Sequence, residues 1–473
     1  MKVPMLDAEL KYLKGSFEII DHQTTVKDRH LLEENIPILA EHAALGKGAE
    51  RGAAQYIIRQ AALALGVVPS SINDLYMARG RGEVPFTFTV PAMNLRMLAF
   101  DAARIVFRVA KEMNAGAFIF EIARSEMGYT DQRPAEYVSS VLAAAIAEGY
   151  SGPVFLQGDH FQVSAKRYAS TPETELEAIK DLTREAIAAG FYNIDIDTST
   201  LVDLTKPTVP EQQKLNYSLS AMFSAYIRSL QPEGIRVSIG GEIGEVGGHN
   251  STEEELQAYM DGYLAELSRL ASKATGLSKI SVQTGTSHGG VVLPDGSIAK
   301  VNLDFDILLK LSRIACSAYG LGGTVQHGAS TLPETAFGKF VESEAAEVHL
   351  ATNFQNIILD RLPDGLRFEM YAYLDKNNAS ERKPDMTDEQ FYYKTRKYAV
   401  GPFKSQTWTL PAGVKSEISR ALEEQFRKLF VYLGMENTRS IVDKYIKPVK
   451  IAPDMKYYLG EAVVEEGVSD LAD

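Results

Sequence analysis

A short apolar run rich in β-forming residues, followed by a longer amphipathic stretch, recurs eight times between residues 85 and 356. The spacing of about 25 to 45 residues between runs suits βα units, whose parallel strands are buried on both faces and therefore read as nearly continuous apolar segments. Eight such units close into a (β/α)8 TIM barrel of about 250 residues, so the pattern predicts an α/β fold of this kind. The predicted strands are PFTFTVPAMN, GAFIFEIAR, GPVFLQGDH, FYNIDIDTS, IRVSIGGEIGE, KISVQTGTSHGG, GGTVQHGAS and AAEVHLATN.

The segments on either side of residues 85–356 show helical periodicity and lack the recurring short apolar runs. The first contains AEHAALGKGAERGAAQYIIRQAALALGVV between polar turns, which predicts an N-terminal helical layer. The last combines the turn-rich, charged stretch LDKNNASERKPDMTDEQ with amphipathic segments such as VKSEISRALEEQFRKLFVYLG. We therefore expect three parts: an N-terminal helical layer over residues 1–84, a catalytic barrel over 85–356 and a C-terminal helical extension over 357–473.

Composition narrows the choice of partners and compartment. With 49 basic and 62 acidic residues the net charge is −13, which disfavours nucleic acid or an anionic membrane as a partner. The single cysteine, Cys316, excludes an intrachain disulfide and suits a reducing compartment. The N-terminus is charged throughout, and no apolar run approaches the roughly 20 residues of a membrane-spanning helix. The sequence predicts a soluble cytoplasmic protein that holds any anionic substrate in a local site.

Five of the eight histidines lie in the barrel segment, each at or just beyond the C-terminal end of a predicted strand. Active sites of (β/α)8 barrels are built on that face. His160, His288 and His327 each have a glycine close by in the sequence, where the backbone can approach a ligand. Three converging imidazoles bind a divalent metal, Zn²⁺ being the first choice for a nitrogen-rich shell with an open position for substrate. Glu242, at the same level of its strand, is a candidate fourth or alternating ligand.

Two alternatives compete with a metal site. Any one of these histidines, taken alone, is explained equally well by a structural contact with a carboxylate. For His249 and His349 both a structural and a functional role stay open. The segment GTSHG, residues 285–289, fits the G-x-S-x-G pattern of a serine hydrolase. That pattern needs a helix directly after the serine, whereas GVVLPDGSIAK follows and indicates a turn. The hydrolase is therefore disfavoured.

Asp159 stands directly beside His160 in the segment GDHF. Side chains at consecutive strand positions diverge, but at a strand end that enters a loop both can reach one site. A carboxylate next to a metal ligand suits proton transfer at a substrate hydroxyl. The glycine-rich turns after the seventh and eighth strands, with Ser330 and Thr352, predict a phosphate site on the same face.

Taken in order, the blocks PAMN, GDH, EIGEVGG, GTSHGG, QHGAS and HLATN resemble the class II, metal-dependent fructose-bisphosphate and tagatose-bisphosphate aldolases. The resemblance implies a homo-oligomeric lyase of carbohydrate metabolism that acts on a ketose phosphate such as fructose 1,6-bisphosphate. Its cofactor would be Zn²⁺ or another divalent metal, and a monovalent cation is a further candidate. The implied residues are Asp159 as acid/base; His160, His288, His327 and Glu242 at the metal; Asn94, Gly289, Gly328, Ser330, His349 and Thr352 at the substrate; and Asp197, Glu245 and His249 around them.

The chain also departs from the pattern of that family. Where fructose-bisphosphate members have paired carboxylates after the EIG block, this chain has His249 and Asn250, and an asparagine does not transfer protons. An asparagine of the last block is His349 here. Either Glu245 or His249 takes over the second proton transfer, or the substrate differs. A sugar-phosphate isomerase or epimerase with the same metal chemistry is the first alternative. A non-catalytic sugar-phosphate-binding homologue is the second, and Asp159 together with three histidines argues against it.

Overall fold

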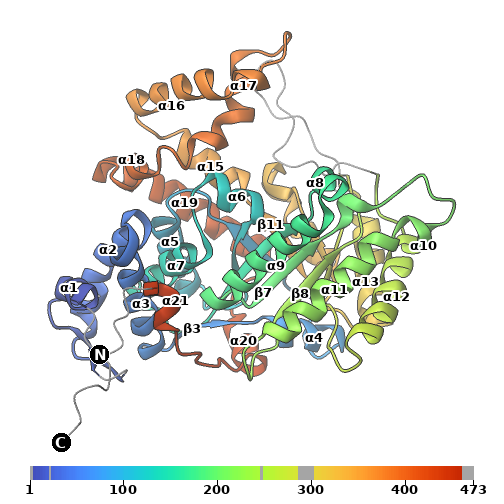
Figure 1. The fold of residues 1–473 in the computed structure, drawn as a ribbon, viewed down its shortest axis with the longest axis horizontal. Helices are drawn as coiled ribbons and strands as arrows, with labels where there is room; N and C mark the ends of the chain where they lie inside the picture. Colours follow the sequence, from blue (N-terminus) through green and yellow to red (C-terminus); the bar gives the residue numbers. More distant parts are fainter. Residues whose placement is uncertain (1–3, 21–22, 245–248, 286–302, 461–473) are drawn as a thin grey trace, which may run out of the picture.

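The computed structural model describes residues 4–20, 23–244, 249–285 and 303–460. Eight parallel strands close into a barrel surrounded by helices (Figure 1). Seven of them lie within predicted apolar runs, and the eighth, β6, extends two residues beyond its run. The predicted (β/α)8 fold is confirmed. The strands are β4 (Val90–Asn94), β5 (Ile119–Ala123), β6 (Gly152–Gln162), β7 (Asn193–Asp197), β8 (Ser238–Glu242), β9 (Lys279–Val282), β10 (Thr324–Gln326) and β11 (Glu347–Leu350), and pairing of β6 with β7 closes the ring.

Helices connect consecutive strands. The helix that follows β8 begins after Thr252, whose hydroxyl accepts a hydrogen bond from Glu255 N while the Glu255 carboxylate accepts one from Thr252 N. This reciprocal cap satisfies two backbone donors that the helix itself leaves unpaired. The connecting helices are α5 (Ala99–Glu112), α6 (Arg124–Tyr129), α7 (Pro134–Ala147), α8 (Ala165–Ser170), α9 (Pro172–Ala189), α10 (Val209–Gln212), α11 (Lys214–Leu230), α12 (Glu253–Leu270), α13 (Phe305–Tyr319) and α14 (Gly338–Glu342), and α15 (Thr352–Leu359) follows the last strand.

The N-terminal part differs from a purely helical layer because it adds strands. Besides its helices it contains an antiparallel hairpin and one strand, β3 (Val67–Ser70), that pairs in parallel with the first half of β6 on the outside of the closed ring. This strand is only four residues long and comes soon after a helix. Its apolar pattern in the sequence therefore cannot be distinguished from that of the last turn of a helix. The other elements are α1 (Pro4–Tyr12), β1 (Phe17–Ile20), β2 (Gln23–Val26), α2 (Arg29–Leu45), α3 (Gly48–Ala64) and α4 (Asn73–Gly80).

Asn193, fully buried on β7, ties the segment around β3 to the barrel. Its Oδ1 accepts a hydrogen bond from Ile72 N at 2.8 Å, and its Nδ2 donates to Leu156 O at 2.9 Å and to Ser70 O at 3.2 Å. Asn193→Ala removes these three buried hydrogen bonds, so we expect the free energy of unfolding to fall by about 2 to 3 kcal/mol. Chemical unfolding followed by circular dichroism measures this change. Asn377→Ala, at an exposed position, is the control, and equal stability of the two variants would contradict the prediction.

The C-terminal part is helical over its described residues. Its first elements, α16 (Asp364–Asn377), α17 (Asp388–Thr395) and the 3₁₀ turn η5 (Arg396–Ala399), stand above the barrel at the top of Figure 1, and we call residues 364–399 the arm. The chain then returns along the barrel, where Phe430 packs against Phe118 with ring centroids 5.8 Å apart. A single apolar core joins both flanks to the barrel. The returning helices are α18 (Lys404–Trp408), α19 (Ala412–Tyr432), α20 (Arg439–Tyr445) and α21 (Met455–Leu459).

Among the helices of the described residues, none has an apolar stretch long enough to cross a bilayer.

Candidate active site

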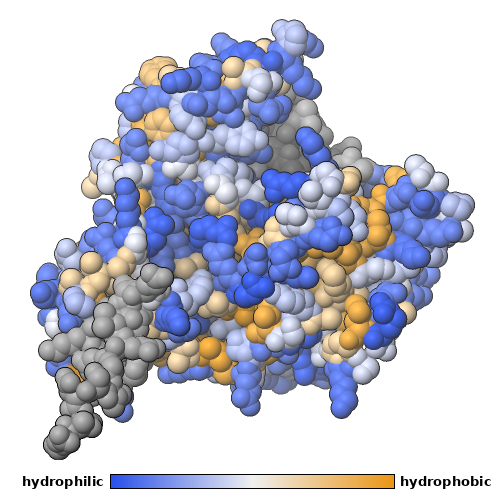
Figure 2. Space-filling view, viewed as in Figure 1, coloured by the Kyte–Doolittle hydropathy of each residue, from blue (hydrophilic) through white to orange (hydrophobic). Residues whose placement is uncertain are grey.

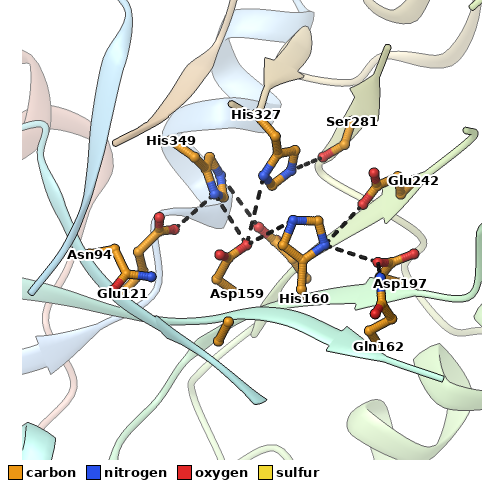
Figure 3. A network of polar contacts seen from close by, with 12 residues as sticks. Asn94, Glu121, Asp159, His160, Gln162, Asp197, Glu242, Ser281, His327 and His349 are labelled. Atoms are coloured by element: carbon orange, nitrogen blue, oxygen red, sulfur yellow. Dashed lines mark hydrogen bonds and ion pairs between the residues drawn. The ribbon is translucent and has the colours of Figure 1, made fainter. Parts of the chain in front are cut away.

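Carboxylate and imidazole side chains from four strands meet at the C-terminal end of the barrel (Figure 3). Asp159 and His160 belong to β6, Glu242 ends β8, His327 follows β10 directly, and His349 belongs to β11. All five line one cavity of about 1170 Å³. The strand ends therefore bring these predicted residues together on the face where barrel enzymes carry their active sites.

A bulge in β6 explains how Asp159 and His160 both reach this cavity. The pairing register with β7 shifts between Gly158 and Phe161, and His160 has φ +41°, in the left-handed region. A β-bulge breaks the alternation of a regular strand and re-aims one side chain. β6 continues to Gln162, so the bulge, and not the predicted strand end, places two consecutive side chains in one site.

Three residues form a candidate metal centre. His160, Glu242 and His327 offer ligand atoms that lie within 4.8 Å of one another. The Nδ1 of His160 lies 2.9 Å from Asp197 Oδ2, so this carboxylate accepts the Nδ1–H and leaves Nε2 as the ligand atom. The Nε2 of His327 lies 3.0 Å from Ser281 Oγ, which holds that ring in place. Two imidazoles and a carboxylate are a donor set that suits Zn²⁺.

Asp159 lies among the imidazoles, as Figure 3 shows. Its Oδ1 is 3.2 Å from His349 Nδ1 and 3.8 Å from His160 Nε2. Burial raises the pKa of Asp159, but the positive imidazoles of His160 and His349 outweigh burial and hold this pKa well below its usual value. Burial lowers the pKa of His349, whereas Glu121 and Asp159 raise it well above its usual value. Asp159 is therefore ionised, as a base must be.

A buried network of charged side chains fills the barrel interior next to Asp159. Lys279 has no exposed surface, and its Nζ donates to Gln157 Oε1 at 2.7 Å, to Asp195 Oδ2 at 3.0 Å and to Glu347. His349 Nε2 lies 2.6 Å from Glu347 Oε1. We did not predict this network from the sequence. Its signal in the sequence is the presence of charged residues inside otherwise apolar strand segments.

The other predicted site residues lie in three kinds of place. Asn94, Gly328, Ser330 and Thr352 line the cavity. His249 is not among the lining residues: its side chain is 55% exposed, and its Nε2 lies 2.6 Å from Glu255 Oε1 at the start of α12. The N-terminal turn of α12 thus holds the ring of His249, and a role for this residue around the site stays a prediction. His288, Gly289 and Glu245 lie outside the described residues.

Basic residues also line this cavity, and we did not predict them as a group from the sequence. No periodic pattern distinguishes them from ordinary surface lysines and arginines, because they come from segments far apart in the chain. One of them, Arg96, pairs with Glu126 through Nη2 and Oε1 at 2.6 Å. The basic lining residues are Arg96, Arg124 and Arg167 from the barrel and Lys383, Lys394, Arg396 and Lys397 from the arm.

Comparisons with known proteins bear on the fold and on the family of this chain. No curated protein sequence matches the chain. Among solved structures, a probable tagatose 6 phosphate kinase from Sinorhizobium meliloti 1021 is similar with a TM-score of 0.52 and 14% identity, over 76% of this chain and 99% of that one. This likeness shows a shared fold.

Two aldolases are less similar in structure. The YdjI aldolase from Escherichia coli K12 has a TM-score of 0.46 and 13% identity over 78% of this chain and 98% of its own. The fructose-bisphosphate aldolase from Campylobacter jejuni has a TM-score of 0.44 and 19% identity over 79% of this chain and 98% of its own.

The match to a protein family is more extensive. Residues 86–410 match the family described as Fructose-bisphosphate aldolase class-II. The match begins beside the predicted start of the barrel and continues past its predicted end, through the arm and the helix that follows it. It covers well over half of the 473 residues. The chain therefore belongs to the class II fructose-bisphosphate aldolase family.

Proposed function

We propose that this protein is a divalent-metal-dependent aldolase that cleaves and forms a ketose phosphate such as fructose 1,6-bisphosphate. The observation that carries the proposal is the convergence of His160, Glu242 and His327 beside the ionised carboxylate of Asp159, in a chain of this family. The family is generally dependent on a divalent metal, and its substrates are sugar phosphates. The predicted homo-oligomeric state stays a prediction.

The donor set supports a metal at this position. His160 and His327 would supply imidazole nitrogens and Glu242 a carboxylate oxygen, which fit Zn²⁺. His288, predicted as a third imidazole, lies outside the described residues. When bound, a divalent metal supplies Lewis acidity that polarises the substrate carbonyl. Asp197 and Ser281 would orient the two histidine rings through the hydrogen bonds described above.

Asp159 is the proposed proton-transfer group. In cleavage its carboxylate removes the proton from the C4 hydroxyl of the ketose, and in condensation it returns that proton. The contact with His349 Nδ1 at 3.2 Å supports this role, because a positive neighbour keeps the carboxylate ionised and oriented. Where the family has an asparagine, this chain has His349, and the imidazole of His349 is the charged partner of the proposed base.

The remaining lining residues suit a phosphorylated sugar. The turns that carry Gly328, Ser330 and Thr352 offer backbone N–H and hydroxyl groups beside the metal ligands, where a phosphate would be held. Asn94 lines the cavity and donates through Nδ2 to Glu126, while its buried Oδ1 has no hydrogen-bond partner among the described residues. That oxygen is available to accept a hydrogen bond from a substrate hydroxyl.

One observation favours a second candidate, a sugar-phosphate isomerase or epimerase. His249 and Asn250, which occupy the positions of the family's paired carboxylates, are not among the cavity-lining residues. In an isomerase or epimerase no carbon–carbon bond breaks: a base removes a proton from the carbon next to the carbonyl, and return of a proton to a different carbon or face of the enediolate gives an isomer of the substrate. The two reactions differ in the mass of their products.

Removal and readdition of metal tests the proposal. We expect a chelator to abolish cleavage of fructose 1,6-bisphosphate and Zn²⁺ to restore it, because the substrate carbonyl loses its Lewis acid when the metal leaves. Metal content is determined on the same samples, and products are identified by mass spectrometry. Two triose phosphates support the aldolase, and an isomer of unchanged mass supports the second candidate. Stoichiometric metal without any turnover would instead indicate a non-catalytic binding protein.

A further inference from the structure

A second cavity lies on the arm, beside the candidate active-site cavity. Its volume is about 690 Å³, within the usual range for small-molecule sites, and its lining residues all come from α16, α17 and η5. Tyr393 and Arg396 line both cavities, which therefore share part of one wall. Figure 2 shows that the lobe of the molecule that corresponds to the arm in Figure 1 has a largely hydrophilic surface. The proposed reaction makes no use of this second cavity, which we call the arm pocket.

Aromatic rings form the apolar part of the arm pocket. The rings of Tyr371 and Tyr392 stack in parallel with their centroids 3.9 Å apart, and Phe368 is 67% exposed. Arg382 Cζ lies 5.9 Å from the centroid of the Tyr392 ring, whereas no cation of the described residues lies over Tyr371 or Phe368. The open faces of such rings attract cations. The aromatic residues of the lining are Phe368, Tyr371, Tyr392 and Tyr393.

Three carboxylates also line the arm pocket, those of Asp375, Asp388 and Glu389. Arg382 pairs with two of them, with Asp375 at 3.0 Å and with Asp388. The Glu389 carboxylate, in contrast, forms no hydrogen bond or ion pair with any residue in the described part of the chain. Glu389 therefore offers an anionic contact in the same pocket as the open aromatic faces.

Arg396, the basic residue of the lining, is engaged by other groups. Its Cζ lies 4.1 Å from the centroid of the Tyr393 ring, its Nη1 lies 3.8 Å from Asp360 Oδ1, and its Nη2 donates to Asn356. With Asp360 included, four carboxylates stand against the two guanidinium groups of Arg382 and Arg396. The arm pocket thus combines open aromatic faces with an excess of negative charge, and this combination suits an organic cation.

We propose that the arm pocket binds a small organic dication, two ammonium groups on a short alkyl chain, of which 1,4-diaminobutane is the simplest probe. Its ammonium groups would pair with the lining carboxylates, first with Glu389, which has no other partner. Its alkyl chain would lie against the rings of Phe368 and Tyr371. The inference goes beyond the proposed function, because the pocket takes neither the sugar phosphate nor the metal.

Calorimetric titration of 1,4-diaminobutane into the zinc-loaded protein tests the site with no sugar phosphate present. We expect saturable binding of the diamine. The control ligand is 1,4-butanediol, which has the same chain length and no charge, and it should bind at least about tenfold more weakly because it forms no ion pair. Absence of saturable diamine binding, or equal binding of the diol, would overturn the site.

Two variants at exposed positions locate the binding. Glu389→Gln removes the carboxylate that has no partner and should raise the Kd of the diamine by about fivefold to tenfold. Phe368→Ala removes an exposed ring and should raise that Kd by about twofold to fivefold. Circular dichroism and thermal melting verify that each variant is folded.

Glu369→Gln is the matched control, since Glu369 is an exposed glutamate of α16 that does not line the arm pocket. It should bind the diamine as the wild type does. An equal loss of affinity in Glu369→Gln and Glu389→Gln would show that the diamine responds only to the net charge of −13, and would overturn the site. Because the titration needs no turnover, its result stays separate from success or failure of the aldolase proposal.

Discussion

Asp159→Ala is expected to lower kcat for cleavage of fructose 1,6-bisphosphate by about 100-fold to 10,000-fold while leaving the metal bound. The physical reason is that a positioned carboxylate removes the hydroxyl proton in the transition state, and water in the same cavity does so poorly. Asp159 is not a member of the His160, Glu242 and His327 group, so its removal takes no ligand from that set. The measurement combines steady-state cleavage kinetics with determination of metal content.

His249→Ala provides the control for this experiment. Its ring is held at the start of α12 by Glu255, away from the cavity lining, so we expect a kcat close to that of the wild type. Near wild-type turnover by Asp159→Ala would remove Asp159 as the proton-transfer group. A large loss of turnover in His249→Ala would instead restore the role first predicted for that histidine from the sequence.

Lys279→Met is expected to lower the free energy of unfolding by about 3 to 5 kcal/mol, the largest effect on stability that the structure implies. Lys279 lies fully buried and donates hydrogen bonds to two carboxylates, those of Asp195 and Glu347. Burial raises the pKa of Asp195 to about 6, whereas Lys279 opposes that rise. Methionine fills a similar volume but supplies no charge, so both carboxylates would stay buried without their shared cation.

A second substitution separates charge from packing. Glu347→Gln in the Lys279→Met background removes one of the two carboxylates that have lost the Lys279 charge, so we expect the double variant to recover part of the lost stability. Unfolding in denaturant is followed by circular dichroism and by the fluorescence of the single tryptophan, Trp408. Lys310→Met is the control, because Lys310 is 64% exposed and its ion pair with Glu253 is worth less than about 1 kcal/mol. Equal losses in Lys279→Met and Lys310→Met would contradict the account of the buried network.

Much of the site could be anticipated because parallel strands present their C-terminal ends on one face. Once eight apolar runs indicated a barrel, His160, His327 and Glu242 were expected to converge, and the structure brings their ligand atoms within 4.8 Å. The buried Glu121 and Glu347 were missed although they interrupt apolar runs. Glu347 pairs with Lys279 and Glu121 pairs with His349, and in each pair the two residues come from different strands that meet only in the closed barrel.

The sequence by itself determined the barrel and the identity of the polar side chains at its mouth, since hydrophobic periodicity and position along a strand are local properties. Only the tertiary structure decided three other features. The bulge that turns Asp159 and His160 into one cavity depends on the register with β7. The addition of β3 depends on pairing with a strand distant in the chain. The place of Lys397 in the cavity wall depends on how the arm packs over the barrel. Contacts between residues distant in sequence set all three, and no local pattern carries that information.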